Sequence, residues 1–151
     1  YYERSLIIRE ELGDKYGIGM SLGNIGIVHA NKCDYDKAAE HLETSLAIQK
    51  EIGLDADGLI WSTTYLYLAY KNLGKDYDEK EIHSLIKETE NIDYELNIRL
   101  YELLEDKSYL ETAYKQVQDK ASAMEEQLAK KFLSYPIPKE IIEEYNKLFK
   151  K

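Results

Sequence analysis

The stretch Gly17-Ile18-Gly19-Met20-Ser21-Leu22-Gly23 is spaced almost like the glycine-rich loop that holds the phosphates of a dinucleotide. That loop has the pattern G-x-G-x-x-G and lies between a strand and a helix, where backbone N–H groups face the pyrophosphate. Here the last glycine comes one residue late, and the surrounding residues have the periodicity of a helix interior. The stretch therefore predicts a helix with a flat strip of glycines along one side, and no nucleotide site.

A second group with possible chemistry is His29, Cys33 and Asp34. His29 and Cys33 are four residues apart and so share a helix face, an arrangement that could bind a soft metal. His41 and His83 have no partner at ligand spacing. Because no serine, cysteine or lysine has a recognisable base and orienting residue nearby, the sequence predicts no active site and no enzyme activity. It also predicts no cofactor.

Charge and composition exclude further classes of function. The net charge of −9 and the isoelectric point of about 4.9 argue against binding nucleic acid. Most of the acidic excess falls in residues 1–90, so a partner attracted by charge should be neutral or basic. Cys33 is the only cysteine, which favours a reducing, cytoplasmic compartment. No apolar run approaches the roughly 20 residues that cross a bilayer, so no membrane segment is predicted.

Helices are predicted along nearly the whole chain, and no stretch has the period-two alternation of an exposed strand. Glycines at positions 13, 53 and 74 are expected to end three of these helices, and Asp34 is expected to cap another. The first predicted helix begins without a methionine or a cap, which suggests the cut edge of a longer protein. The predicted helices cover about residues 1–12, 16–32, 34–52, 59–73, 78–90, 93–104 and 108–133, with a last one after Pro138.

The chain also repeats itself. The segment Ser5-Leu6-Ile7-Ile8-Arg9-Glu10-Glu11-Leu12-Gly13 returns forty residues later as Ser45-Leu46-Ala47-Ile48-Gln49-Lys50-Glu51-Ile52-Gly53. A period of this length is typical of stacked helical units that bury their apolar faces against one another. Arrays of this kind usually bind other molecules, so the repeat predicts a scaffold for recognition.

Two segments identify a family resemblance. Leu22-Gly23-Asn24-Ile25-Gly26-Ile27-Val28-His29 resembles the first helix of a tetratricopeptide repeat, and Asp34-Tyr35-Asp36-Lys37-Ala38 resembles its turn and the start of the second helix. The resemblance covers about residues 1–133, as half a repeat plus three, and implies antiparallel helix pairs stacked in a right-handed superhelix. Residues 134–151 then form a proline hinge and a C-terminal capping helix. In the repeat, His29 takes the place of a tyrosine and Cys33 that of a turn glycine, so packing explains both.

The long form of the repeat is similar to arrays in kinesin light chains and in bacterial signalling proteins. The segment from Lys75 to Lys151, with Tyr109-Leu110-Glu111-Thr112-Ala113-Tyr114 and Ser134-Tyr135-Pro136-Ile137-Pro138, resembles tails attached to bacterial nucleotide cyclases. The resemblance implies a protein–protein interaction scaffold, a regulatory part of a larger cytoplasmic signalling protein, which binds a peptide or partner domain in its concave groove.

The family's groove positions can be transferred to this chain. The asparagine that matches Asn24 pairs with the backbone of an extended peptide in relatives, and Trp61 and Tyr65 would be apolar anchors. Two structural alternatives stay open, because Asn24 could bond to a neighbouring repeat and Trp61 could fill a gap between repeats. The implied peptide- or partner-binding positions are Met20, Asn24, Ile27, Asn31, Trp61, Thr64, Tyr65, Leu68, Asn72, Glu95, Arg99 and Glu102, followed by Asp106.

Apolar residues on the predicted helix over residues 108–133 alternate at spacings of four and three, which is a heptad seam. The last helix could fold back over this seam, since terminal repeats need a cover. Alternatively the helix pairs with its copy in a homodimer, and the chain is an oligomerisation module that positions an attached enzyme such as a nucleotide cyclase. The seam consists of Leu110, Tyr114, Val117, Ala121, Met124 and Leu128.

Overall fold

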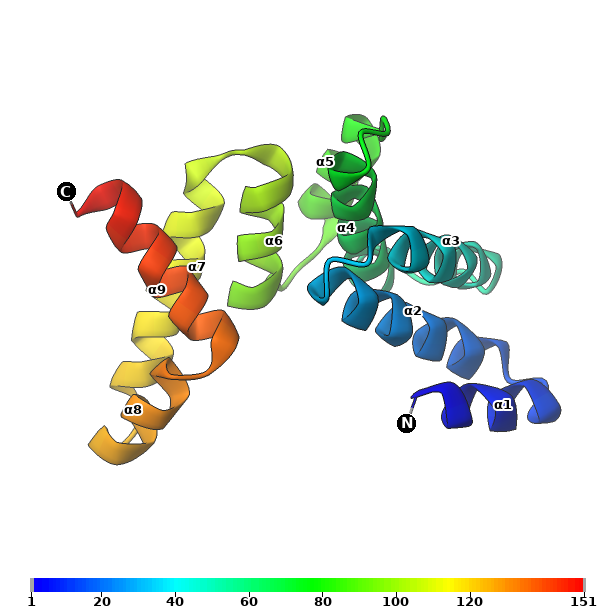
Figure 1. The fold of residues 1–151 in the computed structure, drawn as a ribbon, viewed down its shortest axis with the longest axis horizontal. Helices are drawn as coiled ribbons and strands as arrows, with labels where there is room; N and C mark the ends of the chain where they lie inside the picture. Colours follow the sequence, from blue (N-terminus) through cyan, green and yellow to red (C-terminus); the bar gives the residue numbers. More distant parts are fainter. Residues whose placement is uncertain (1, 151) are drawn as a thin grey trace. The chain divides into compact units, whose positions relative to one another are not determined.

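The computed structural model describes residues 2–150, and at positions 9, 11 and 12 it describes the backbone alone. Within that range the regular elements are nine helices without a strand, which confirms the predicted all-α fold (Figure 1). No described helix is both long and apolar enough to span a lipid bilayer. The helices are α1 (Tyr2–Leu12), α2 (Lys15–Asn31), α3 (Tyr35–Glu51), α4 (Ala56–Asn72), α5 (Glu79–Glu88), α6 (Tyr94–Leu104), α7 (Lys107–Ser122), α8 (Glu126–Leu133) and α9 (Pro136–Phe149).

Aspartates precede most of the helices and satisfy backbone N–H groups in the first turn. The Asp14 carboxylate accepts a hydrogen bond from the Gly17 N–H at 2.9 Å, and Asp55 accepts one from the Gly58 N–H at 3.1 Å. Such a cap contributes about 1 kcal/mol to helix stability. Asp34 also stands at an N-cap position, but its side chain makes no capping bond, so the predicted cap is wrong in this detail.

Three helices end at the glycines that were predicted to end them. Gly13, Gly53 and Gly74 have φ angles of +66°, +78° and +73°, the left-handed conformation that glycine adopts without steric cost. Cys33 takes the same conformation after α2, with φ of +61°. It therefore occupies a turn position that normally favours glycine, as the repeat pattern implies.

The prediction of one continuous helix over residues 108–133 is wrong. α7 ends at Ser122, and a turn separates it from α8, which begins at Glu126. The break has a packing reason, because it returns Phe132 to the cluster around Val117, where only 6% of Phe132 is exposed. The last helix also begins earlier than predicted, at Pro136, since a proline in the first turn loses no helical hydrogen bond.

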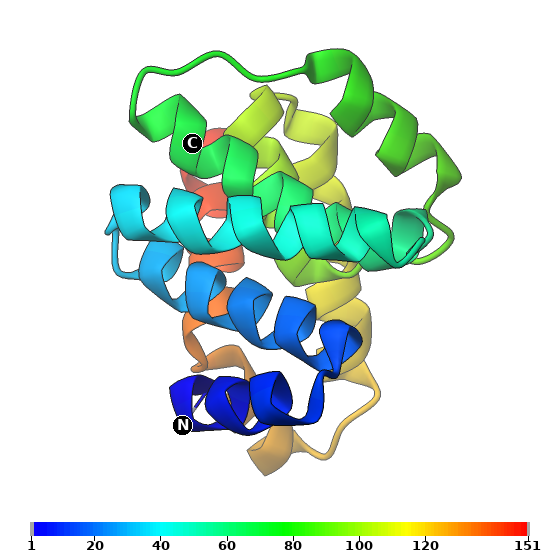
Figure 2. The same cartoon turned by 90° about the vertical axis from the view of Figure 1, so that its right-hand side faces the viewer.

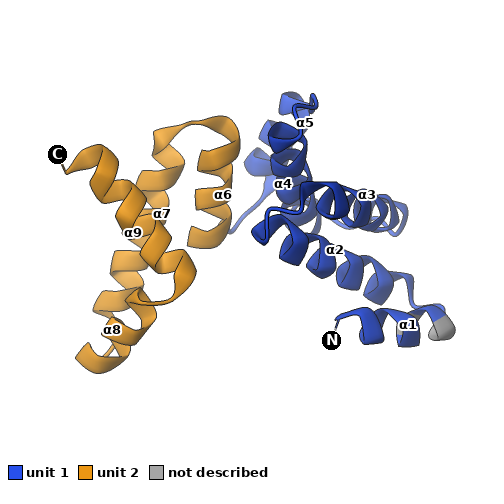
Figure 3. Ribbon diagram, viewed as in Figure 1, with its two compact units in different colours: residues 1–91 blue, residues 92–151 orange. Residues whose placement is uncertain are grey.

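The chain divides into two compact units, residues 1–91 and residues 92–151, called here unit 1 and unit 2 (Figure 3). Unit 1 contains α1 to α5, and its first three helices lie side by side in successive layers (Figure 2). Unit 2 contains α6 to α9. The boundary near residue 133 that the repeat pattern predicts separates repeat helices from a capping segment, and that division remains a prediction.

The glycine strip of α2 packs against α3 at very short range. A Cβ atom added at Gly26 would lie 2.5 Å from Leu42 Cγ, and one added at Gly23 would lie 3.0 Å from Ser45 Oγ. At Gly19 the nearest atom would be Ile48 Cγ2, at 3.2 Å. These distances confirm that the glycines permit a close helix crossing, which offsets their low helix propensity.

In unit 2, α9 covers the face of α7 that bears the heptad seam. Leu110 and Val117 of α7 are fully buried with Ile141 of α9 in one apolar cluster. The rings of Tyr114 and Tyr145 stack across the same interface, with centroids 3.7 Å apart. The predicted covering role of the last helix is therefore confirmed.

Candidate functional site

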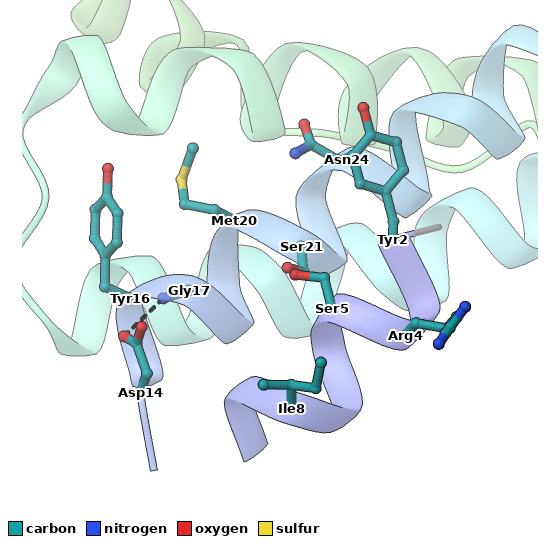
Figure 4. A pocket seen from close by; sticks show the side chains of 10 residues that line it. All are labelled: Tyr2, Arg4, Ser5, Ile8, Asp14, Tyr16, Gly17, Met20, Ser21 and Asn24. Carbon is teal, nitrogen blue, oxygen red and sulfur yellow. Dashed lines mark hydrogen bonds between the residues drawn. The ribbon is translucent and has the colours of Figure 1, made fainter. Parts of the chain in front are cut away.

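An open groove of about 700 Å³ lies between α1 and α2 in unit 1 (Figure 4). α2 presents residues of one helical face to it, at spacings of three and four, and α1 presents the opposite wall. In Figure 4 the side chains of Ser5 and Ser21 meet between the two helices, and Tyr2 lies beside Asn24. The lining residues are Tyr2, Arg4, Ser5, Ile8, Asp14, Tyr16, Gly17, Met20, Ser21 and Asn24.

The groove offers apolar surface with few charges. Ile8 and Tyr16 are 57% and 56% exposed, and Met20 is 37% exposed. Arg4 and Asp14 are the charged residues of its lining, and the Asp14 carboxylate already caps α2. The groove is large enough to hold several side chains of a protein partner. Its wall is mostly apolar, and the Asn24 amide lies at one side, a combination that suits protein binding.

Two of the predicted groove residues on α2 line this site. Met20 and Asn24 face the groove one helical turn apart, and Asn24 is half-buried. Ile27, which is half-buried, and Asn31, which is exposed, lie further along α2 and do not line it. The structure therefore brings together the first two members of the predicted set on this helix.

The predicted positions on α4 are more buried than their proposed role requires. Thr64 and Tyr65 are 0% and 1% exposed, and Leu68 is also buried. Trp61 is half-buried and stacks on the Tyr65 ring, with centroids 6.4 Å apart. Asn72 is exposed, and its amide donates to the backbone carbonyl of Leu68. Contact of these residues with a partner stays a prediction.

The predicted positions on α6 lie in unit 2, where Arg99 joins two helices. Arg99 Nη1 donates to Glu102 Oε1 at 2.7 Å and to Glu140 Oε1 of α9 at 3.2 Å. Arg99 is only 9% exposed, so these charge-assisted bonds hold α9 against α6. Glu95 is half-buried nearby, and burial together with Asp93 raises the pKa of its carboxyl.

Glu102 titrates at an unusually high pH in this cluster. Burial is the largest cause, and repulsion from Glu140 adds to it while Arg99 opposes it, so the pKa of the Glu102 carboxyl rises to about 7. The groups facing it are therefore Arg99 on its own helix and Glu140 on α9. Because the folded state holds this proton more tightly than the unfolded state, the stabilisation is complete below about pH 4.5 and is lost as the pH rises through about 7.

We expect the free energy of unfolding to fall by about 1 kcal/mol between pH 5 and pH 8 through Glu102, less than the full shift implies because solvent screens a partly exposed group. Chemical denaturation at the two pH values measures this. Glu102→Gln should remove most of the difference, whereas Glu111→Gln, at an exposed carboxylate on α7, should leave it unchanged. An equal pH dependence in Glu102→Gln and the wild type would contradict the assignment.

His29 and Cys33, the residues of the possible soft-metal pattern, have different surroundings in the structure. Cys33 is exposed, and the His29 ring stacks on His41 with centroids 5.3 Å apart. Among the residues that the structure describes, no three histidine, cysteine or acidic side chains are grouped so that they could hold a metal ion. Packing of α2 on α3 accounts for the positions of both histidines.

The seam residues predicted for self-association lie mostly inside unit 2. Leu110 and Val117 are fully buried, and Tyr114 and Met124 pack against the same cluster. Leu128 on α8 differs, because it is 55% exposed. Pairing of this seam with a second copy stays a prediction, and α9 occupies the surface that such pairing would need.

The α1 wall of the groove was missed in the analysis of the sequence. Tyr2, Ser5 and Ile8 form this wall, and two of them lie in the forty-residue repeat, where Ser5 and Ile8 correspond to Ser45 and Ile48 of α3. Because Ser45 and Ile48 face the glycine strip of α2, the repeat itself contained the signal that the matching face of α1 is a helix-packing surface.

Comparison with protein families agrees with the repeat pattern. Residues 1–51, which comprise α1, α2 and α3, match the tetratricopeptide repeat family. Comparison with curated proteins and with solved structures gave no match. The matching segment contains both helices that form the groove.

Proposed function

We propose that this chain is a non-catalytic interaction scaffold that holds part of another protein in the groove between α1 and α2. One observation supports this most strongly: the groove is open, largely apolar, and contains Met20 and Asn24, two positions that the family resemblance assigns to partner binding. The family match over residues 1–51 adds support, because tetratricopeptide repeats generally mediate interactions between proteins.

The character of the partner follows from charge and composition. The chain has a net charge of −9, so a neutral or basic protein or peptide would approach it more readily than an acidic one. The single cysteine favours work in a reducing, cytoplasmic compartment. From the sequence resemblance we propose, in addition, that the scaffold regulates a larger signalling protein.

Self-association through residues 108–133, with an attached enzyme positioned by the dimer, has less support. The helix predicted for this role is interrupted between α7 and α8, and Leu110 and Val117 are covered by α9 of the same unit. The partner-binding groove is therefore the preferred proposal.

Site-specific photo-cross-linking tests the proposed function. A photoreactive amino acid replaces either Met20 or Asn31, which are both exposed on the same helix, but only Met20 lines the groove. In lysate from the source organism, we expect the Met20 variant to cross-link a specific protein that the Asn31 variant does not capture. Equal capture at both positions, or none at either, would count against a partner in this groove.

A further inference from the structure

Two acidic side chains from different helices meet where α9 packs on α6 in unit 2. Arg99 Nη1 donates to Glu102 Oε1 at 2.7 Å and to Glu140 Oε1 at 3.2 Å, and Arg99 Nη2 donates to Glu140 Oε2 at 3.4 Å. The carboxyl groups of Glu102 and Glu140 also share a hydrogen bond with each other. One guanidinium group therefore lies beside two acids, one from each helix.

The hydrogen bond between the two carboxyl groups requires a proton. An ionised carboxylate only accepts hydrogen bonds, so either Glu102 or Glu140 must be protonated for this bond to form. Two carboxylates held this close repel each other, and Arg99 has one positive charge to set against both of them. The shared proton is therefore part of the contact between α6 and α9.

The charges around this pair do not replace the proton. The other charged groups nearby come from α6, α9 and the turn into α7: Glu95, Glu105, Lys107 and Glu144. Lys107 is the base among them, and it lines the same hollow of about 430 Å³ as Glu102 and Glu105. When the shared proton leaves, the contact is left with an excess of negative charge.

The rest of the contact made by α9 is largely apolar. Ile141 is fully buried against the cluster that contains Leu110 and Val117 of α7, and the Tyr145 ring stacks on Tyr114. The helix lies on α6 and α7 as a separate element, joined to α8 through residues 134–135 (Figure 1). It can therefore separate from both helices without the unfolding of either.

We propose that α9 is a proton-dependent strap, held closed over α6 and α7 while Glu102 and Glu140 share a proton and released more readily once both are ionised. Opening of the strap uncovers the heptad seam of α7, including Leu110 and Val117. The strap lies within unit 2 and the groove within unit 1, so this inference does not depend on the function proposed for the groove.

The direction of the pH effect follows from where the proton is held more tightly. In the closed state, burial and Glu140 raise the pKa of the Glu102 carboxyl from 4.5 to about 7, against the opposing effect of Arg99. In the open state, water surrounds this carboxyl and its pKa returns to the ordinary value. The equilibrium constant for closing is therefore greatest below about pH 4.5 and falls as the pH rises through about 7.

Residue-resolved hydrogen exchange of the whole chain tests the proposal, because exchange detects rare open states. Protection factors are obtained at pH 5 and pH 8 by dividing the intrinsic exchange rate at each pH by the observed rate. We expect the amides of α9 to be less protected than those of α7 at both pH values. From pH 5 to pH 8, the protection of α9 should fall by about fivefold, after allowance for solvent screening.

Matched variants identify the group that controls the strap. Glu102→Gln should make the protection of α9 independent of pH, because an amide can donate a hydrogen bond to Glu140 throughout this range. Glu140→Gln should have the same effect from the opposite helix, and so it tests the pair even if Glu102→Gln fails to fold. Glu143→Gln, at an exposed carboxylate of α9, should keep the fivefold fall of the wild type.

Three results would overturn the proposal. Equal protection of α9 and α7 would show that the strap does not open separately. Protection of α9 that is the same at pH 5 and pH 8 would show that opening does not depend on the proton. A fivefold fall that persists in both Glu102→Gln and Glu140→Gln would show that another group controls it.

Discussion

Gly26→Val is expected to lower the free energy of unfolding of unit 1 by about 3 kcal/mol, at the upper end of what overpacking usually costs. A Cβ atom at this position would lie 2.5 Å from Leu42 Cγ and 3.3 Å from the backbone carbonyl oxygen of Ala38. Leu42 is fully buried, so its branch carbon has no space into which it can move. The valine therefore forces α2 and α3 apart and loosens the packing along the strip.

The fluorescence of Trp61, the only tryptophan, reports the unfolding of unit 1 in a denaturant titration. Ala47→Val is the matched control, because Ala47 is exposed on α3 and its replacement changes only helix propensity, by less than about 1 kcal/mol. The double variant with Leu42→Ala should recover part of the loss due to Gly26→Val, since the smaller side chain removes the clash. Equal denaturant midpoints of unfolding for Gly26→Val and Ala47→Val would show that α2 and α3 do not cross closely at Gly26.

The parts of the fold that depend on local chemistry could be predicted from the sequence. Helix periodicity, the glycines at the helix ends and the small residues of α2 all act within a few positions of the chain, and the structure confirms them. The break between α7 and α8 could not be predicted in this way. It depends on Phe132 returning to an apolar cluster that contains Ile141 of α9, a contact between distant segments.

Only some residues of the candidate site could be predicted from the sequence. Met20 and Asn24 followed from the family resemblance, because the repeat specifies which face of α2 looks outward. The environment of Arg99 did not follow, since its burial depends on Glu140, which lies forty-one residues later on α9. The opposite wall of the groove was present in the sequence as the repeat of Ser5 and Ile8, but it became recognisable only once the contacts of Ser45 and Ile48 were known.

The glycine strip determines how the helices of unit 1 pack. It lets α2 cross α3 closely enough to bury Ser45 and Leu42.

Asn24→Ala is expected to weaken partner binding by about 2 kcal/mol, which is roughly a thirtyfold loss of affinity. Asn24 is half-buried in the groove wall, and its amide can both donate and accept a hydrogen bond. Truncation would leave the polar group that it contacts on the partner without a hydrogen bond inside a closed interface. The loss comes from that unpaired group more than from the contact area removed.

The most direct test of the groove as the binding site is a calorimetric titration of the protein captured at Met20 against two matched variants, Asn24→Ala and Asn31→Ala. Both asparagines belong to α2 and both were predicted from the family pattern, but only Asn24 lines the groove. We predict roughly a thirtyfold loss of affinity for Asn24→Ala and less than a twofold change for Asn31→Ala. Equal losses in the two variants, or a greater loss for Asn31→Ala, would contradict the groove between α1 and α2 as the site of binding.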